Sequence, residues 1–185
     1  ELRVEERRVN WEILDVWRDA AAECGIPKIE EFNQGDNFGN AFFQMNQKSG
    51  KRWSAVRAFL DPIRSRKNLT ILTEATAERV ALETTNAGAR ARGVIVKEKG
   101  KIRSIEADTE VILSAGAVAS PQLLQVSGVG PPDLLSSFAI KPLINSPGVG
   151  KNLQDHLQIR TIYEVKNTTT LNQKAGSLWG KAMMG

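Results

Sequence analysis

The segment from Val111 to Gly130 constrains the fold more than any other part of the chain, because it passes from an apolar run to small residues and then to a helical pattern. It opens with the apolar run Val111-Ile112-Leu113, which is typical of a buried parallel strand. The small residues of 114–117 follow and leave the backbone nearly bare. Open α/β sheets bind their ligands at the carboxyl ends of strands. This turn is therefore a candidate binding site.

A helix is predicted after the turn. Ser120 is a favourable N-cap, and Pro121 suits the first helical position. Leu123 and Val126 contribute to an apolar side, and Gly128 is predicted to end the helix in a left-handed conformation. The pattern of strand, small-residue turn, helix and glycine stop brings backbone close to a ligand, but it does not by itself identify that ligand.

Read as a whole, the segment resembles the second signature of the glucose-methanol-choline oxidoreductases, flavoenzymes that oxidise alcohols with FAD. Gly116-Ala117, Ser120-Pro121, Leu123-Leu124 and Ser127-Gly128-Val129-Gly130 stand at the family's spacing. Further stretches continue the resemblance in family order from about Glu23 onward: Phe32-Asn33 with Gly35-Asp36, Arg52-Trp53-Ser54-Ala55, Asn68-Leu69-Thr70-Ile71-Leu72, and the run from Gly148 to His156. Many motifs in one order are far more specific than a single glycine motif.

The resemblance implies an α/β fold, present here as an α+β fragment. We expect part of a Rossmann-like FAD-binding domain with a three-stranded antiparallel meander, together with pieces of a substrate-binding domain. The expected divisions are 1–50 for a substrate-domain helix and loop, 51–130 for the centre of the FAD-binding domain, and 131–185 for a return into the substrate domain. The whole is expected to be a central fragment of a longer enzyme.

The implied activity is that of an FAD-dependent oxidoreductase acting on CH-OH groups, similar to alcohol and choline dehydrogenases. Hydride transfer from the alcohol to the flavin would give an aldehyde or ketone. The alternative that the residues leave open is a non-enzymatic Rossmann-like module that binds another nucleotide or a protein. The substrate alcohol, the electron acceptor and the oligomeric state are not indicated.

Two places are expected to contact FAD. By alignment on Asn68, the resemblance places Ala77 where the backbone N–H and C=O meet the adenine edge. The second place is Ser114-Ala115-Gly116, where the lack of bulk would let the adenosine lie against the chain. The alternative for Gly116 is a strand-to-helix turn with no ligand.

The chemistry of catalysis is not visible in this chain. A Gly-x-Gly-x-x-Gly turn, which usually holds a pyrophosphate at a helix N-terminus, is not found in the sequence. His156 is the only histidine, and the resemblance places the family's catalytic histidine beyond this chain. We therefore expect a structural hydrogen bond at His156 and assign no catalytic residue. The isolated chain is expected to be inactive and to retain FAD poorly.

The composition and charge of the chain bear on other classes of protein that it could belong to. The 185 residues are 41% hydrophobic and 25% charged, as in an ordinary globular protein. The net charge is +4, but basic residues are interspersed with acidic ones, so nucleic-acid binding is not expected. No metal-ligand spacing is found, and no apolar run approaches the roughly 18 residues of a membrane helix. We expect a cytoplasmic protein and leave a peripheral membrane association open.

The rest of the chain gives coarser predictions. Residues 11–21 have the apolar spacing of a helix that faces a core, ended by Gly25, and Cys24 is expected to be a small buried residue. An irregular loop follows over 28–50, in which four phenylalanines are expected to anchor the loop rather than to wall a pocket. They are Phe32, Phe38, Phe42 and Phe43.

Beyond the loop, Ser54 is expected to cap a helix that Pro62 disturbs or ends. A buried strand is predicted over 69–73, and the meander over 77–82, 91–97 and 101–107, with turns at 86–89 and 98–100. Asp133 is expected to cap a helix through Phe138. A loop, an alternating strand over 157–165 and a helix-like segment at the end of the chain complete the predictions.

Overall fold

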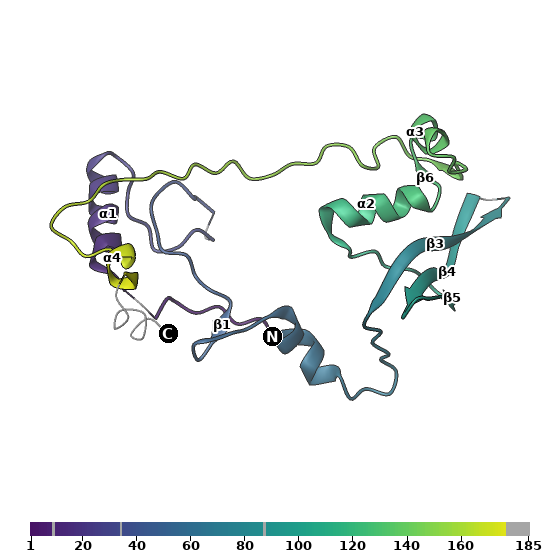
Figure 1. Cartoon of the computed structure of the whole chain (residues 1–185), viewed down its shortest axis with the longest axis horizontal. Helices are drawn as coiled ribbons and strands as arrows, with labels where there is room; N and C mark the ends of the chain where they lie inside the picture. Colours follow the sequence, from purple (N-terminus) through teal and green to yellow (C-terminus); the bar gives the residue numbers. More distant parts are fainter. Residues whose placement is uncertain (9, 34, 87, 177–185) are drawn as a thin grey trace. The chain divides into compact units, whose positions relative to one another are not determined.

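The computed structural model describes residues 1–8, 10–33, 35–86 and 88–176. The chain divides into two compact units, Glu1–Thr70 with Arg160–Gly185, and Ile71–Ile159. We call them the terminal unit and the central unit (Figure 1). The division after Thr70 lies further along the chain than the boundary expected after residue 50. Which unit serves the cofactor and which the substrate stays a prediction.

The first element of the terminal unit is the helix α1, Glu12–Glu23, which confirms the predicted helix. It ends where Gly25 takes φ +85° and donates its N–H to the carbonyl of Ala22 (3.0 Å). The expectation that the helix faces a core is wrong for the described residues. Ala21 is its only buried residue, and Trp17 is 49% exposed. Cys24 is also exposed rather than buried, because it follows the last helical turn.

The segment from Lys28 to Gly50 is mostly irregular, as predicted, and a buried asparagine supports it. Asn40 is 4% exposed. Its Nδ2 donates to the carbonyl of Ile26 (2.8 Å), and its Oδ1 accepts from Nε of Arg18 on α1 (3.1 Å). The prediction missed a short hairpin of β1, Gln47–Lys48, and β2, Lys51–Arg52.

The four phenylalanines of this loop differ in role. The ring centroids of Phe32 and Phe43 are 5.4 Å apart, and the guanidinium of Arg18 lies 4.6 Å from the Phe42 centroid. Phe38 and Phe43 are 67% and 79% exposed. Phe32 and Phe42 therefore anchor the loop as expected, whereas Phe38 and the still more exposed Phe43 do not.

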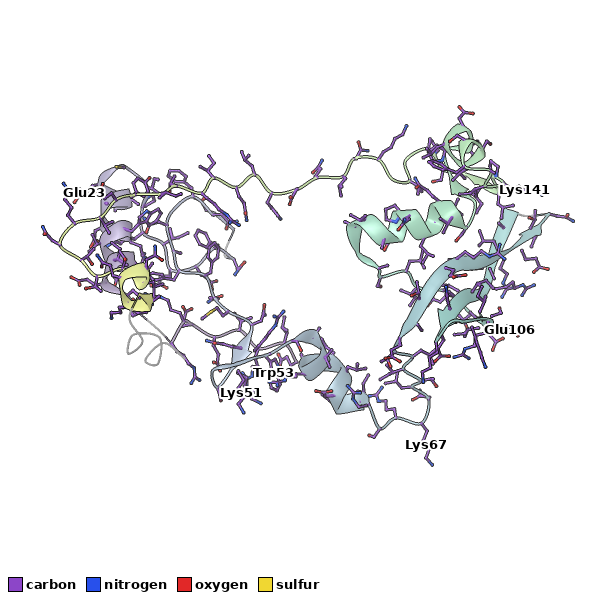
Figure 2. All side chains as sticks on the ribbon, viewed as in Figure 1. Glu23, Lys51, Trp53, Lys67, Glu106 and Lys141 are labelled. Carbon is purple, nitrogen blue, oxygen red and sulfur yellow. The ribbon has the colours of Figure 1, made fainter. Side chains whose placement is uncertain are left out.

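The helix predicted after Ser54 is a π-helix, η1, Val56–Leu60, followed by a 3-10 turn, η2, Asp61–Ile63, which contains Pro62. The expected cap is wrong, because no side chain caps η1, and Ser54 contributes its backbone carbonyl to the N–H of Ala58 (2.9 Å). The preceding Trp53, labelled in Figure 2, donates its indole N–H to the carbonyl of Glu1 (3.0 Å).

The central unit is built on an antiparallel sheet in the order β3, β4, β5, which confirms the predicted meander (Figure 1). The strands are β3, Ala75–Thr85, β4, Gly88–Glu98, and β5, Lys101–Glu106. Lys99 (φ +48°) and Gly100 (φ +81°) form the turn between β4 and β5. The predicted turn between β3 and β4 includes Ala87, which lies outside the described residues.

Helix α2, Gly116–Val126, packs against β3. It starts earlier than predicted, so Ser120 is not its N-cap and Pro121 lies inside it. The Ser120 Oγ instead accepts a hydrogen bond from the backbone N–H of Ala115 (3.0 Å). The predicted end is confirmed, because Gly128 takes φ +89° and donates its N–H to the carbonyl of Gln125 (2.9 Å).

Two short parallel strands follow α2. They are β6, Val129–Gly130, and β7, Ile144–Asn145. Between them lies helix α3, Pro132–Ser137, whose N-cap is Pro131. Asp133 lies in the first turn and is not the cap, because the helix already begins at Pro132, a residue favoured at this position. Leu135 of α3 is 1% exposed and forms the core with Val80 and Leu123.

Three predicted strands are absent from the described residues. Segments 69–73, 111–113 and 157–165 form neither helix nor strand. Ile112 and Leu157 are 76% and 93% exposed. A strand requires hydrogen bonds to a neighbouring strand, and no described segment supplies them here. Near the end of the chain, a capping box at Thr170 begins helix α4, Leu171–Ala175. The predicted helix-like segment also covers 177–185, outside the described residues.

Candidate functional site

The small-residue turn lies immediately before and at the start of α2. Ser114, Ala115 and Gly116 are all exposed. Gly116 takes φ +86°, and a Cβ placed on it would meet no atom within 4 Å. Residues with side chains rarely adopt this conformation. The backbone conformation therefore favours glycine here, and the turn presents accessible main chain.

Ala77, the second predicted contact, lies on β3. It is exposed and is paired with Val96 of β4. The next pair in the register joins Arg79 to Ile95, so Glu78 is an extra residue and forms a bulge. Within the described part of the central unit, β3 is an edge strand of its sheet. The bulge and the open edge together expose backbone beside Ala77.

The elements that carry these two places meet at a buried serine. Ser127, 7% exposed, accepts a hydrogen bond from the backbone N–H of Val80 on β3 (2.8 Å). Its hydroxyl donates to the carbonyl of Leu123 on α2 (2.6 Å). This role of Ser127 was not predicted from the sequence. The available signal was a serine between an apolar helix face and the Gly128 stop.

A second glycine-containing motif lies against α2. Gln125 donates its Nε2 to the carbonyl of Val149 (3.1 Å). Gly150 takes φ +82°, and a Cβ there would lie 2.5 Å from Nε2 of Gln125. The loop and the helix line a cavity of about 820 Å³ that also includes Lys151 and Gln154. The helix with the small-residue turn and the 148–154 loop thus form one surface.

His156 follows this loop and is exposed. Its backbone N–H donates to Oδ1 of Asp155 (2.8 Å). This bond involves only the main chain of His156, so the structural hydrogen bond expected for its side chain stays a prediction. In the part of the chain that the structure describes, no group of three or more His, Cys, Asp or Glu side chains could hold a metal ion.

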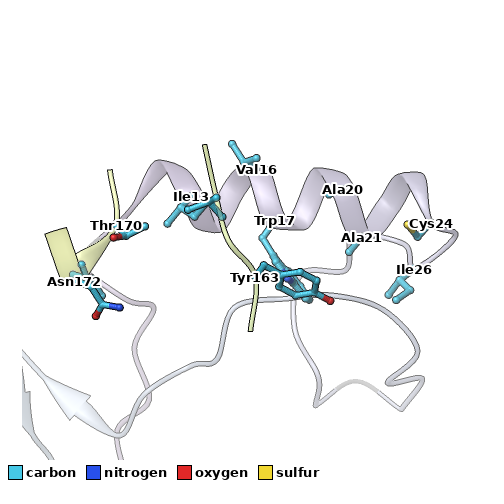
Figure 3. A pocket seen from close by; sticks show the side chains of 12 residues that line it. Ile13, Val16, Trp17, Ala20, Ala21, Cys24, Ile26, Tyr163, Thr170 and Asn172 are labelled. Carbon is cyan, nitrogen blue, oxygen red and sulfur yellow. The ribbon is translucent and has the colours of Figure 1, made fainter. Parts of the chain in front are cut away.

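The terminal unit contains a separate cavity of about 690 Å³ beside α1 (Figure 3). Its lining is mainly apolar and comes from α1 and from residues near Tyr163 and Leu171. Figure 3 shows the side chains of Trp17 and Tyr163 on the same side of the helix. Trp17 and Tyr163 are 49% and 65% exposed, so the apolar face of α1 lines an open cavity rather than a core.

Over residues 1–8, 10–33, 35–86 and 88–176, none of the helices combines the length and apolar character that crossing a membrane needs.

The chain matches a known class of protein, the flavoprotein oxidoreductases. A family model described as GMC oxidoreductase matches residues 1–158. The chain belongs to the GMC oxidoreductase family.

Relatives of named function fall in the same class. The chain is 40% identical over 164 residues to an oxygen-dependent choline dehydrogenase of Pectobacterium atrosepticum, covering 88% of this chain and 28% of that protein. The identity is 42% with oxygen-dependent choline dehydrogenase 1 of Chromohalobacter salexigens, with the same coverage. The chain thus spans less than a third of the length of these relatives.

Solved structures agree on the fold. Pyridoxine 4-oxidase from Mesorbium loti matches with a TM-score of 0.74 and 35% identity, covering 84% of this chain and 30% of that one. A fungal aryl-alcohol oxidase matches with a TM-score of 0.77 and 26% identity, covering 83% and 26%. The mixed helix and strand architecture expected from the sequence is therefore confirmed.

Proposed function

We propose that the protein containing this chain is an FAD-dependent oxidoreductase that oxidises an alcohol. The observation that carries the proposal is the exposed turn at Gly116, whose φ of +86° only glycine adopts readily. Membership of the GMC oxidoreductase family and relatives named as choline dehydrogenases support the same activity. A quaternary ammonium alcohol such as choline is the substrate class we would test first.

The residues of the central unit fit the adenosine half of FAD. Ser114, Ala115 and Gly116 offer a backbone surface without large side chains, against which a flat group could pack. Ala77 lies exposed beside the bulge of an edge strand, where main-chain N–H and C=O groups are within reach of a ligand. In our proposal, the adenine edge meets the backbone at Ala77 and the adenosine lies against the Gly116 turn.

The bound flavin would supply the hydride acceptor, and this chain would supply binding and orientation. We assign no catalytic residue to the described part of the chain. His156 is exposed, and its described hydrogen bond comes from its backbone. The alternative of a non-enzymatic binding module is not favoured, because the relatives reported above are named as dehydrogenases and oxidases.

The test uses the full-length protein encoded by the gene that contains this sequence. We expect the purified protein to carry FAD and its flavin absorbance to be bleached by an alcohol under anaerobic conditions. Choline, benzyl alcohol and pyridoxine would be compared as substrates. A protein with no bound or bindable FAD would overturn the proposal, and flavin that no alcohol reduces would overturn the activity.

A further inference from the structure

The strongest unassigned feature is the hydroxyl of Ser127, which makes two buried hydrogen bonds between α2 and β3. It accepts from the Val80 N–H and donates to the Leu123 carbonyl, at 2.8 and 2.6 Å. The two hydrogen bonds share the Ser127 hydroxyl, so each strengthens the other cooperatively. Ser127 therefore fixes the backbone of β3 to the helix, a task that apolar packing alone performs less precisely.

The hydrogen bond between Val80 and Ser127 lies next to a bulge in β3. Val80 stands just beyond the bulge at Glu78, and Ala77 stands just before it. A bulge interrupts the ladder and loosens the register locally. The bond at Val80 ties the strand to α2 immediately after the interruption. The placement of the Ala77 backbone relative to α2 therefore depends on Ser127.

The same helix begins at the other predicted contact. Gly116 is the first residue of α2, and Ser127 directly follows its last residue. A helix transmits position along its length because its backbone is rigid. Fixing one end of α2 to β3 thus fixes the Gly116 turn relative to Ala77, although Ser127 itself is buried and far along the helix from the turn.

We infer that Ser127 is a positioning residue for adenosine binding, which it serves by holding Ala77 and Gly116 in register through its two hydrogen bonds. This inference rests on the proposed function. It predicts that loss of the hydroxyl weakens recognition of the adenosine half of FAD and spares recognition of the flavin half.

The experiment compares FAD with FMN, which lacks the adenosine half, on the full-length apoprotein by quenching of flavin fluorescence. We expect Ser127→Ala to weaken FAD about tenfold, since it leaves the Val80 N–H unpaired, and to change FMN affinity less than twofold. Ser127→Thr keeps a hydroxyl and should restore the FAD to FMN ratio to within about threefold of wild type.

The matched control is Ser137→Ala. The Ser137 hydroxyl also donates to a carbonyl of its own helix, that of Leu134 (2.7 Å), but Ser137 is exposed. We expect it to leave both affinities unchanged. If Ser127→Ala does not fold, Ser127→Cys replaces it, because a thiol has a similar shape but forms only weak hydrogen bonds. The ratio of FAD affinity to FMN affinity should again fall.

The outcomes separate the two claims. A wild-type protein that binds no FAD overturns the proposed function. A wild-type protein that binds FAD, with an alanine or cysteine variant that loses FAD and FMN affinity equally or loses neither, overturns the positioning role of Ser127.

Discussion

The sheet of β3, β4 and β5 and the two apolar runs that flank it, 69–73 and 111–113, have similar strand-forming sequences but different outcomes. The sheet pairs its strands through short turns, as between Glu98 and Lys101. The runs form no strand, and Ile112 is 76% exposed. A meander finds its partners within a few residues, whereas a buried parallel strand depends on partners far along the sequence.

The prediction with the largest expected effect concerns the packing of β4 against β5. At Gly93 in β4, a Cβ would lie 2.1 Å from the backbone oxygen of Ile105. Because backbone cannot yield as a flexible side chain does, Gly93→Ala should separate β4 from β5 and cost about 3 kcal/mol of unfolding free energy. Urea denaturation of this chain, followed by circular dichroism, would measure the loss.

The matched control for this prediction is Gly100→Ala. A Cβ on Gly100 would meet nothing within 4 Å, although φ is +81°. Only the backbone conformation is unfavourable, so the expected loss is about 1 kcal/mol. Equal losses for the two variants would mean that the contact between β4 and Ile105 is looser than the structure indicates.

The second prediction concerns the unpaired runs. In the present chain Ile112→Ala should change the unfolding free energy by less than about 0.5 kcal/mol, because the side chain is 76% exposed. In the full-length protein we predict that 111–113 is a buried strand, where the same change should cost about 2 kcal/mol. Ile102→Ala, on the already paired β5 and 64% exposed, is the control.

A cost that is the same in both proteins would contradict this difference. It would mean that 111–113 stays exposed in the longer protein and that its apolar sequence does not indicate a strand.

Structure was predicted correctly from the sequence where the determining contacts are local. The turn at Lys99 and Gly100 and the helix stop at Gly128 depend on neighbouring residues and were predicted. The start of α2 was misplaced because Gly116, at φ +86°, allows the helix to begin at the turn itself. Ser120 then lies inside the helix, where its hydroxyl accepts from Ala115. A capping rule cannot distinguish these two arrangements.

The candidate site shows the same limit. Ala77 and Ser114–Gly116 were found through motifs in family order, and their roles as cofactor contacts stay predictions. Ser127 was not found, because its partner Val80 is 47 residues away in sequence. A hydrogen bond across that separation leaves no periodic signal. Only the fold reveals that a helix-terminal serine replaces a neighbouring strand as the partner of this N–H.

The third prediction addresses the turn itself. Gly116→Val in the full-length protein should weaken FAD binding about tenfold, because a β-branched residue resists φ +86° and its side chain would occupy the proposed adenosine site. Ser120→Ala removes the acceptor of the Ala115 N–H and should lower the melting temperature with flavin content largely kept. Full flavin occupancy in Gly116→Val with loss in Ser120→Ala would indicate that the turn does not face the cofactor.

The prediction with the smallest expected effect concerns the contribution of ion pairs to the stability of the sheet. Arg103 on β5 and Glu98 on β4 form an ion pair of 2.8 Å, with side chains 48% and 27% exposed. Exposed pairs contribute little, because water screens them and ordering long side chains costs entropy. Glu98→Gln should therefore cost about 0.5 kcal/mol at low ionic strength, and the cost should shrink in about 1 M salt, where the Debye length is roughly 3 Å.

Glu83→Gln, which removes the more exposed pair with Arg92, is the matched variant and should cost no more. Urea titrations at both salt concentrations would measure these differences. A loss near that of Gly93→Ala would show that charge pairing, rather than backbone pairing and close packing, supplies most of the stability of this sheet.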